Sequence, residues 1–442
     1  MHRKKSSGLR YWLEVLLTEL TFARRELAQI PVFRVVFSKA RFLIPLLVLV
    51  LLILAGRALV NAPEAFGYLQ QFNISQAPAT GSQQSVSFLK GKTASLSWIQ
   101  GSDCQSGVQA YLRSASANPD AALVGTGWVN PLDGSLNTSS HNQCMSGSDS
   151  MDNVISLIHS KGGMAYLTIT MDTDATWSWQ QAAAYIDTAS TNSSYITPII
   201  NEVIRAHYDG VIMDLEGVDH TYPNIQQLFA NYNQRVRAAM QRLHRPYGIA
   251  LLHKLSDSDA YYNLNAFENW RLLGHSADFI VIMAVDQSYL SPGPTASVAW
   301  LNQLLAYTLQ TMPNMLPHII WELPLYGNAW HWANGGWVFD GDVTFADAQQ
   351  TVSQLSPSQI QASASNLKDT YSPHVVYTDS SGVLHSLWYF NGTGLYNTIV
   401  GFWTVLAQEP QFANSHVKLA IAVWWRTTAE PQDFWSHLDT LY

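Results

Sequence analysis

The sequence contains few charged residues: Asp, Glu, Lys and Arg make up 13% of its 442 residues, whereas 47% are hydrophobic. A chain this apolar can bury enough surface to fold, which excludes intrinsic disorder. Basic residues are also scarce, with 24 Lys and Arg against 32 Asp and Glu, so the overall charge argues against binding to nucleic acid. The length suits one large domain with additional segments.

Long apolar runs are absent except for one, at residues 42–60, which is interrupted only by Arg57. These 19 residues are long enough to cross a bilayer as a helix, with Arg57 reaching the interface. Basic residues just before the run predict a cytoplasmic N-terminus and an extracellular remainder. A cleavable signal peptide is the alternative, but its basic region would span about 41 residues, far more than usual. The flanking basic residues are Arg34, Lys39 and Arg41.

The charge pattern divides the chain around this signal anchor. Residues 1–41 hold nine Lys or Arg and three Glu, and their leucines recur at steps of three and four. This pattern predicts a basic amphipathic helix on the inner leaflet, or a short coiled coil. Residues 61–92 are rich in Gln, Ser, Ala and Gly and predict a linker. Residues 93–442 then form an extracellular domain of a single-pass membrane protein.

Cysteine is nearly absent, and its two occurrences, Cys104 and Cys144, both fall in the exported region. Two cysteines outside the cytoplasm predict one disulfide, with two unpaired thiols as the alternative. The 14 His show no close metal-ligand spacing, so neither a metal nor an organic cofactor is expected. No sequence feature indicates an oligomeric state.

Short apolar runs alternate with longer amphipathic patterns from Ser95 onward, and the clearest helical patterns cover 224–243 and 298–312. Eight strand–helix units predict a (β/α)8 TIM barrel. A doubly wound sheet is the alternative, but the number of strands and the lack of a Gly-rich phosphate loop weigh against it. The predicted strands are 95–99, 122–128, 164–170, 210–215, 248–253, 279–284, 318–324 and 419–425.

The predicted barrel region is longer than the ~250 residues of a plain barrel. The excess lies between the seventh and eighth strands, at about 331–400. Within it, residues 375–378 and 383–390 flank a turn with the sequence DSSG, which predicts a β-hairpin. The sequence therefore predicts a small α+β insertion at this point.

The most informative segment is YDGVIMDLEG at 208–217. Period-two alternation places Ile212, Asp214 and Glu216 on one face of the predicted strand, toward its C-terminal end. Barrel active sites are built at that end. Two neighbouring carboxylates raise each other's pKa, so one can stay protonated near neutral pH and act as a general acid. A solvated or salt-bridged acidic turn is the alternative.

This segment resembles the strand-four motif of glycoside hydrolase family 18, the chitinases and their relatives, which is Asp-Gly-x-(Asp/Asn)-x-Asp-x-Glu. Asp209, Gly210, Asp214 and Glu216 match it. Further segments extend the resemblance, in order, over about 94–436, and are closest to the spore-cortex and sporulation-type N-acetylglucosaminidase branch, although its lysin-motif repeats are not found. They are MAVD at 283–286, PGPTAS at 292–297, LPLYG at 323–327, TFADA at 344–348, and Trp425-Arg426 with Glu430 and Trp435.

The resemblance implies cleavage beside a sugar that carries a 2-acetamido group, whose own oxygen attacks the anomeric carbon. Glu216 would protonate the leaving oxygen and then activate water. Asp214 would hold the acetamido N–H and stabilise the charged intermediate, and Asp286 would support it from the sixth strand. The residues expected to bind substrate are Trp425, Tyr326, Tyr289, Trp330 and Trp98.

Two positions depart from the family pattern. Ile212 replaces the first acid or amide of the motif, which removes a hydrogen-bond partner of Asp214. Val285 replaces a Tyr whose hydroxyl holds the acetamido oxygen, and its loss could cost ~10²-fold in rate unless the nearby Tyr289 substitutes.

The sequence thus predicts a membrane-anchored glycosidase that cleaves an N-acetylglucosamine polysaccharide, either peptidoglycan or a chitin-like polymer. Ile212 and Val285 are expected to reduce its activity. A weakly active or inactive, lectin-like carbohydrate-binding protein on the same scaffold is the alternative.

Overall fold

The structure is a computed structural model, and it describes residues 95–99, 104–114, 121–138, 151–171, 176–259, 263–364, 371–413, 419–424 and 426–441. The predicted basic segment 1–41, membrane span 42–60 and linker 61–92 lie outside these residues, as do Cys144 and Trp425. Within them, we find no helix with both the length and the apolar character needed to cross a bilayer. The described residues all belong to one compact unit, Gln84–Tyr442.

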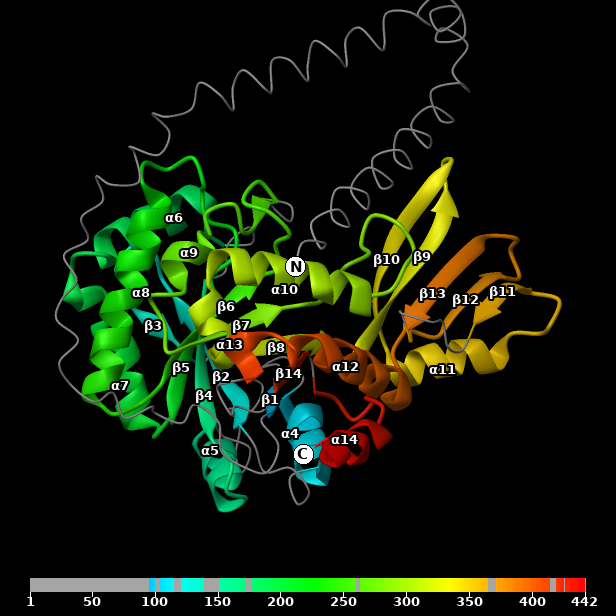
Figure 1. The fold of residues 1–442 in the computed structure, drawn as a ribbon, viewed down its shortest axis with the longest axis horizontal. Coiled ribbons are helices and arrows are strands. Elements are labelled where there is room, and N and C mark those ends of the chain that lie inside the picture. The colour runs from blue at the N-terminus through cyan, green and yellow to red at the C-terminus, as the bar shows by residue number, and fades with distance from the viewer. Residues whose placement is uncertain are drawn as a thin grey trace, which may run out of the picture. The chain divides into compact units, whose positions relative to one another are not determined.

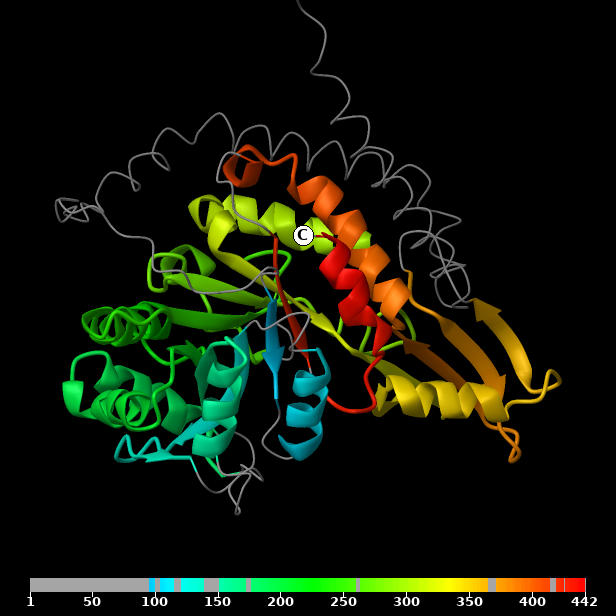
Figure 2. The ribbon, with the colours of Figure 1, turned by 90° about the horizontal axis from the view of Figure 1, so that it is seen from below.

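Eight parallel strands close into a barrel (Figures 1 and 2). Each strand pairs in parallel with its neighbours, and β1 pairs with both β2 and β14, which closes the sheet. The eight predicted strands and the barrel-type α/β fold are thereby confirmed. The strands are β1 (Ser95–Trp98), β2 (Ala121–Val129), β4 (Ala165–Thr170), β5 (Gly210–Met213), β6 (Tyr247–Leu252), β7 (Phe279–Met283), β8 (Ile319–Pro324) and β14 (Ala420–Trp424).

Helices surround the barrel (Figure 1). The two predicted long helices appear as α8 (Ile225–Arg242) and α10 (Val298–Thr311). The cap of α10 is Ser297, whose side chain accepts a hydrogen bond from Trp300 N and so satisfies a free donor of the first turn. The other helices are α4 (Cys104–Ser114), α5 (Met151–Ser160), α6 (Trp179–Ala189), α7 (Thr197–Arg205), α9 (Trp270–Leu273), α12 (Gly392–Leu406), α13 (Pro410–Ala413) and α14 (Asp433–Leu438).

Outside the second sheet, the described residues also form the strand β3 (Leu136–Asn137) beside β2 and the helix α11 (Phe345–Gln354). They include the short 3-10 helices Ser193–Tyr195, Pro313–His318 and Asp439–Leu441.

The barrel strands are buried on both faces, and their side chains form two separate cores. Outward-facing residues pack against the helices, for example Ile319, Trp321 and Leu323 of β8. Inward-facing residues fill the barrel, for example Ile320 of β8 and Ile212 of β5. Because side chains alternate along a strand, each strand's final inward residue points toward the C-terminal opening of the barrel.

A second, antiparallel sheet of five strands follows β8 (Figure 1). Only Leu325 separates the end of β8 from Tyr326, the first residue of β9. Helix α11 covers one face of the sheet, where its Ala348 packs with Val375 and Leu387 of the sheet. The predicted hairpin is confirmed as β12 and β13. The strands are β9 (Tyr326–Ala333), β10 (Gly336–Thr344), β11 (Ile360–Ala364), β12 (His374–Thr378) and β13 (Leu384–Tyr389).

The limits of this insertion differ from the expected 331–400 at both ends. It starts earlier because the chain passes from β8 into β9 with only Leu325 between them. It ends earlier because α12 packs through Leu395, Ile399 and Phe402 in the core between the strands and helices of the barrel. That helix therefore belongs to the outer layer of the barrel.

Candidate active site

A cavity of about 200 Å³ opens at the C-terminal ends of the barrel strands. Its walls combine acidic side chains with aromatic and aliphatic ones, and they contain no basic side chain among the described residues. Residues from six barrel strands and from two strands of the second sheet contribute to it. The lining residues are Trp98, Asp214, Glu216, Leu252, Met283, Val285, Asp286, Glu322, Tyr326, Asp342 and Trp424.

Strand β5 delivers the two acidic residues of the motif to this cavity. The backbone N–H of Asp214 donates to Ile169 O on the adjacent strand at 2.8 Å, so the strand pairing extends to the first carboxylate. Glu216 follows two residues later, and Gly217 turns the chain away with a φ of +65°. The predicted placement of Asp214 and Glu216 at one cavity is therefore what the structure has.

Burial changes the acidity of both carboxyls. It raises the pKa of Asp214 to about 7. Burial raises the pKa of Glu216 to about 8, and the charges of Asp214 and Asp286 add to the effect. A carboxyl with a pKa above neutral holds its proton at physiological pH and can donate it to a leaving group. Glu216 therefore has the properties of a general acid.

Asp286 approaches the same cavity from the end of β7. Its backbone has a φ of +57°, in the left-handed region that few residues other than glycine adopt. Tyr326 donates its hydroxyl proton to Asp286 Oδ1 at 2.7 Å. Burial raises the pKa of Asp286, and hydrogen bonds from Tyr326 and Asn328 oppose that rise. An uncommon backbone conformation at a cavity is typical of a functional position.

Two further acids in the cavity were not expected from the sequence. Glu322 lies on β8, two residues after the inward-facing Ile320, and is only 2% exposed. Asp342 comes from β10 of the second sheet, and burial followed by the charge of Asp286 raises its pKa to about 6. A charged residue in the middle of a buried strand is a sequence signal for Glu322. No local pattern indicates Asp342, because a distant hairpin brings it to the site.

The predicted aromatic residues divide into two groups. Trp98 and Tyr326 line the cavity, and Trp98 meets Trp424 edge-on with ring centroids 5.8 Å apart. Trp424 follows the inward-facing Ala420 and Ala422 on β14, so alternation turns it into the barrel. The predicted cavity floor, Trp425, lies outside the described residues.

Tyr289 and Trp330 pack together away from the cavity lining. Trp330 Nε1 donates to Tyr289 O at 2.9 Å, and the Tyr289 ring lies 4.3 Å from that of Phe339 on β10. Val285 does line the cavity, so an aliphatic side chain occupies the position where the family motif has a tyrosine. The tyrosine hydroxyl that reaches the cavity belongs to Tyr326 instead.

The first two residues of the acidic motif have a structural role at the opposite end of β5. Asp209 Oδ2 accepts a hydrogen bond from Ala165 N at 2.7 Å and lies 2.8 Å from His159 Nε2. A Cβ on Gly210 would approach the Tyr166 ring to 2.4 Å, so only glycine fits there. The motif therefore combines residues that hold the strand with residues that face the cavity.

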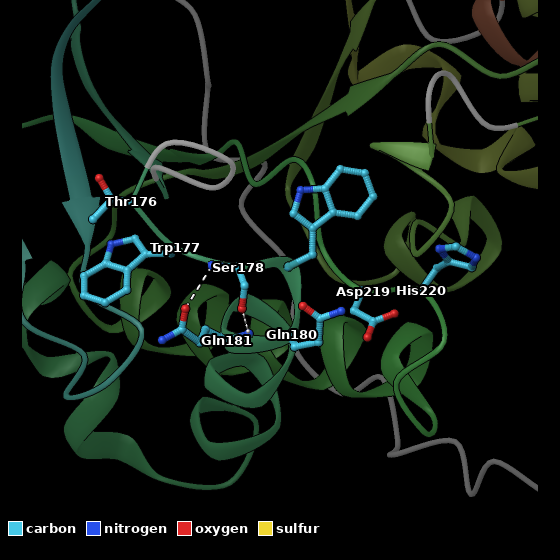
Figure 3. A pocket seen from close by; sticks show the side chains of 8 residues that line it. Thr176, Trp177, Ser178, Gln180, Gln181, Asp219 and His220 are labelled. Atoms are coloured by element: carbon cyan, nitrogen blue, oxygen red, sulfur yellow. Dashed lines mark hydrogen bonds between the residues drawn. The ribbon is translucent and has the colours of Figure 1, made fainter.

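A second, open hollow of about 600 Å³ lies at the same end of the barrel (Figure 3). It is formed after β4 by Trp177, Trp179 and Gln180 and after β5 by Asp219 and His220. Ser178 and Gln181 cap α6 reciprocally and hold the β4 side of the hollow in place. Partly buried indoles beside polar groups suit the apolar faces and hydroxyls of a sugar.

Comparison with solved structures shows the fold. No protein-family model matches the sequence, and no curated protein sequence matches it. A chitinase from Chromobacterium violaceum superimposes with a TM-score of 0.62 at 17% identity, over 78% of this chain and 98% of that one. The spore cortex-lytic enzyme SleL of Bacillus cereus gives 0.62 at 17% identity, over 78% and 73%.

The C-terminal domain of a putative chitinase from Desulfitobacterium hafniense gives a TM-score of 0.61 at 20% identity, over 79% of this chain and 98% of that one. The structural neighbours are thus chitinases and spore cortex-lytic enzymes, the two groups that the sequence motifs indicate. At these identities the likeness establishes a shared fold.

Proposed function

We propose that this protein is a glycoside hydrolase that cleaves an N-acetylglucosamine polysaccharide by the substrate-assisted route. The observation that carries the proposal is the pair Asp214 and Glu216 at the C-terminal opening of the barrel, with the pKa of Glu216 raised to about 8. The structural neighbours support the same substrate class, because those named as chitinases or cortex-lytic enzymes share the fold.

In this mechanism Glu216 protonates the glycosidic oxygen while the acetamido oxygen of the substrate attacks the anomeric carbon. Asp214 accepts a hydrogen bond from the acetamido N–H and stabilises the positive charge of the cyclic intermediate. Glu216, now ionised, removes a proton from the water that opens this intermediate. Asp286 and Tyr326, joined by their 2.7 Å hydrogen bond, form the side wall of the acetamido pocket.

The test is incubation of the full-length chain with chitin oligosaccharides and with purified peptidoglycan, followed by mass analysis of the products. We expect hydrolysis of at least one of them. A matched oligosaccharide with a free amine at the cleavage-site sugar should not be cleaved, because it lacks the nucleophile. Cleavage of both sugars would exclude the substrate-assisted route, and binding without cleavage would favour the lectin-like alternative.

The hollow beside α6 is proposed to bind the polysaccharide beyond the cleavage site. Trp179→Ala should lower kcat/KM on polymeric substrate by about 10-fold, since stacking on a tryptophan is lost, and should change kcat/KM on a disaccharide little. Trp403→Ala is the matched control, because Trp403 packs against the core away from this hollow. Equal losses on both substrates would show that the hollow does not hold sugar.

Membrane anchoring through 42–60 and a disulfide between Cys104 and Cys144 remain proposals that rest on the sequence. Anchoring keeps such an enzyme close to a cell-surface polysaccharide. Protease treatment of intact spheroplasts should digest the barrel domain, whereas protection would contradict this topology.

Non-reducing peptide mass spectrometry should find the two cysteines linked.

A further inference from the structure

The side chain of Glu322 lies inside the barrel and lines the cavity. Its neighbours in register on the adjacent strands are Met283 and Ala422, which offer no polar group. The residue is 2% exposed, and its Oε2 atom has no hydrogen-bond partner among the described residues. A buried carboxyl oxygen without a hydrogen-bond partner is costly, which suggests that Glu322 is kept in this strand for a function.

Asp214 likewise has a carboxyl oxygen without a hydrogen-bond partner in the described part of the chain. Its Oδ1 atom is also buried and has no hydrogen-bond partner among the residues that the structure describes. The side chain below it on the same face of β5 is Ile212, which is fully buried and apolar. Strand β5 therefore gives Asp214 no donor from inside the barrel. Asp214 and Glu322 line the same cavity of about 200 Å³.

The charges around Glu322 favour its protonated form. Asp214, Glu216 and Asp286 all face it and are acidic, so each disfavours a negative charge on Glu322. The Trp98 indole lowers the pKa of Glu322 and so opposes this effect. The Tyr326 phenol is neutral, because its own pKa is raised well above the usual range. Burial, followed by these charges, raises the pKa of Glu322 well above its usual range. A protonated carboxyl has one O–H donor to offer.

We propose that Glu322 is a positioning residue whose carboxyl O–H donates a hydrogen bond to Asp214 Oδ1 from the barrel interior. It would take the place of the acid or amide that the motif has at the position of Ile212. This hydrogen bond holds Asp214 in one orientation and leaves its other oxygen for the substrate acetamido N–H. It also stabilises the ionised form of Asp214, which the charged intermediate requires. The inference rests on the proposed function, and it explains how a motif without its first acid retains a supported Asp214.

Three variants of the full-length chain test the proposal. Glu322→Leu removes the donor, so kcat should fall about 10- to 100-fold with little change in KM. Without the donor the pKa of Asp214 rises, so the acidic limb of the kcat–pH profile should move up by about one pH unit. Glu322→Gln keeps an N–H donor and should retain most of the rate and an unshifted acidic limb. Adding Ile212→Asn to Glu322→Leu should restore both the rate and the position of the acidic limb, because the introduced amide would approach Asp214 from β5.

A structural role alone would not produce this pattern. Equal impairment of the Gln and Leu variants, without rescue by Ile212→Asn, would overturn the proposal, as would a Leu variant with a wild-type rate and profile. The melting temperature of each variant identifies losses that come from unfolding.

An infrared difference spectrum tests the protonation state without any activity. Wild type minus Glu322→Gln at neutral pH should show the carbonyl stretch of a protonated carboxyl. A carboxylate signal in its place would overturn the proposal. If the wild type hydrolyses none of the substrates, the proposed function fails, and this spectrum still decides whether Glu322 carries a proton.

Discussion

Glu216→Gln is expected to lower kcat by about 10²- to 10⁴-fold, the range of a lost general acid and base, while oligosaccharide affinity stays near that of the wild type. Glutamine matches glutamate in size but cannot give a proton to the leaving oxygen or take one from water. Both halves of the proposed reaction therefore lose the same group. Reducing-end assays measure kcat, and isothermal titration calorimetry with a chitin oligosaccharide measures the affinity.

Glu202→Gln provides the matched control. Glu202 lies on α7, where it pairs with Arg205 on the outer surface of the barrel, so the same substitution there should leave kcat unchanged. Full activity of Glu216→Gln would end the assignment, because it would show that another group protonates the leaving oxygen.

The loss of wild-type activity at alkaline pH follows from the same residue, whereas the acidic limb of the profile reports on Asp214. Glu216 must be protonated when the glycosidic bond breaks, and its pKa is raised to about 8. The rate should therefore persist through neutral pH and fall as the pH rises through about 8. An ordinary solvent-exposed glutamate would have lost its proton near pH ~4.3. A rate that already falls near pH 5 would contradict the buried environment of Glu216.

The barrel could be predicted because each of its strands carries its own local signal. Strands such as β7, with the sequence FIVIM, are uniformly apolar since both of their faces are buried. The acidic pair Asp214 and Glu216 was accessible for a similar reason, because alternation along one strand fixes which side chains share a face. Both inferences depend only on neighbours within one segment.

The remainder of the site depends on contacts between distant segments. Asp342 reaches the cavity only because β10 pairs with β9, and β9 continues directly from β8. Tyr326 could be assigned to the pocket, but its hydrogen bond to Asp286 joins residues that lie 40 positions apart in the chain. Tyr289 illustrates the converse, since nearness to Asp286 along the chain does not bring its ring to the cavity lining.

A buried arginine follows β14 and connects it to the first strand and to two helices. The Arg426 side chain is 1% exposed and makes two hydrogen bonds to Glu430, at 2.8 and 3.0 Å. It also donates to Ser97 on β1 and to Ser114 on α4, at 3.2 and 3.0 Å. Its guanidinium lies 4.1 Å from the centroid of the Trp435 ring. One side chain thus connects the last strand, the first strand and two helices.

Arg426→Met should therefore destabilise the fold by about 3–5 kcal/mol, because Glu430 would remain buried without its counter-charge. Urea denaturation of the full-length chain measures the free energy of unfolding. Arg205→Met is the control: Arg205 and its partner Asp152 have side chains that are 54% and 59% exposed, and the loss of such a surface pair costs about 1 kcal/mol or less. The double variant Arg426→Met with Glu430→Leu should recover part of the loss, since no unpaired charge is then buried. If Arg426→Met costs no more than Arg205→Met, the buried pair does not hold the barrel closed.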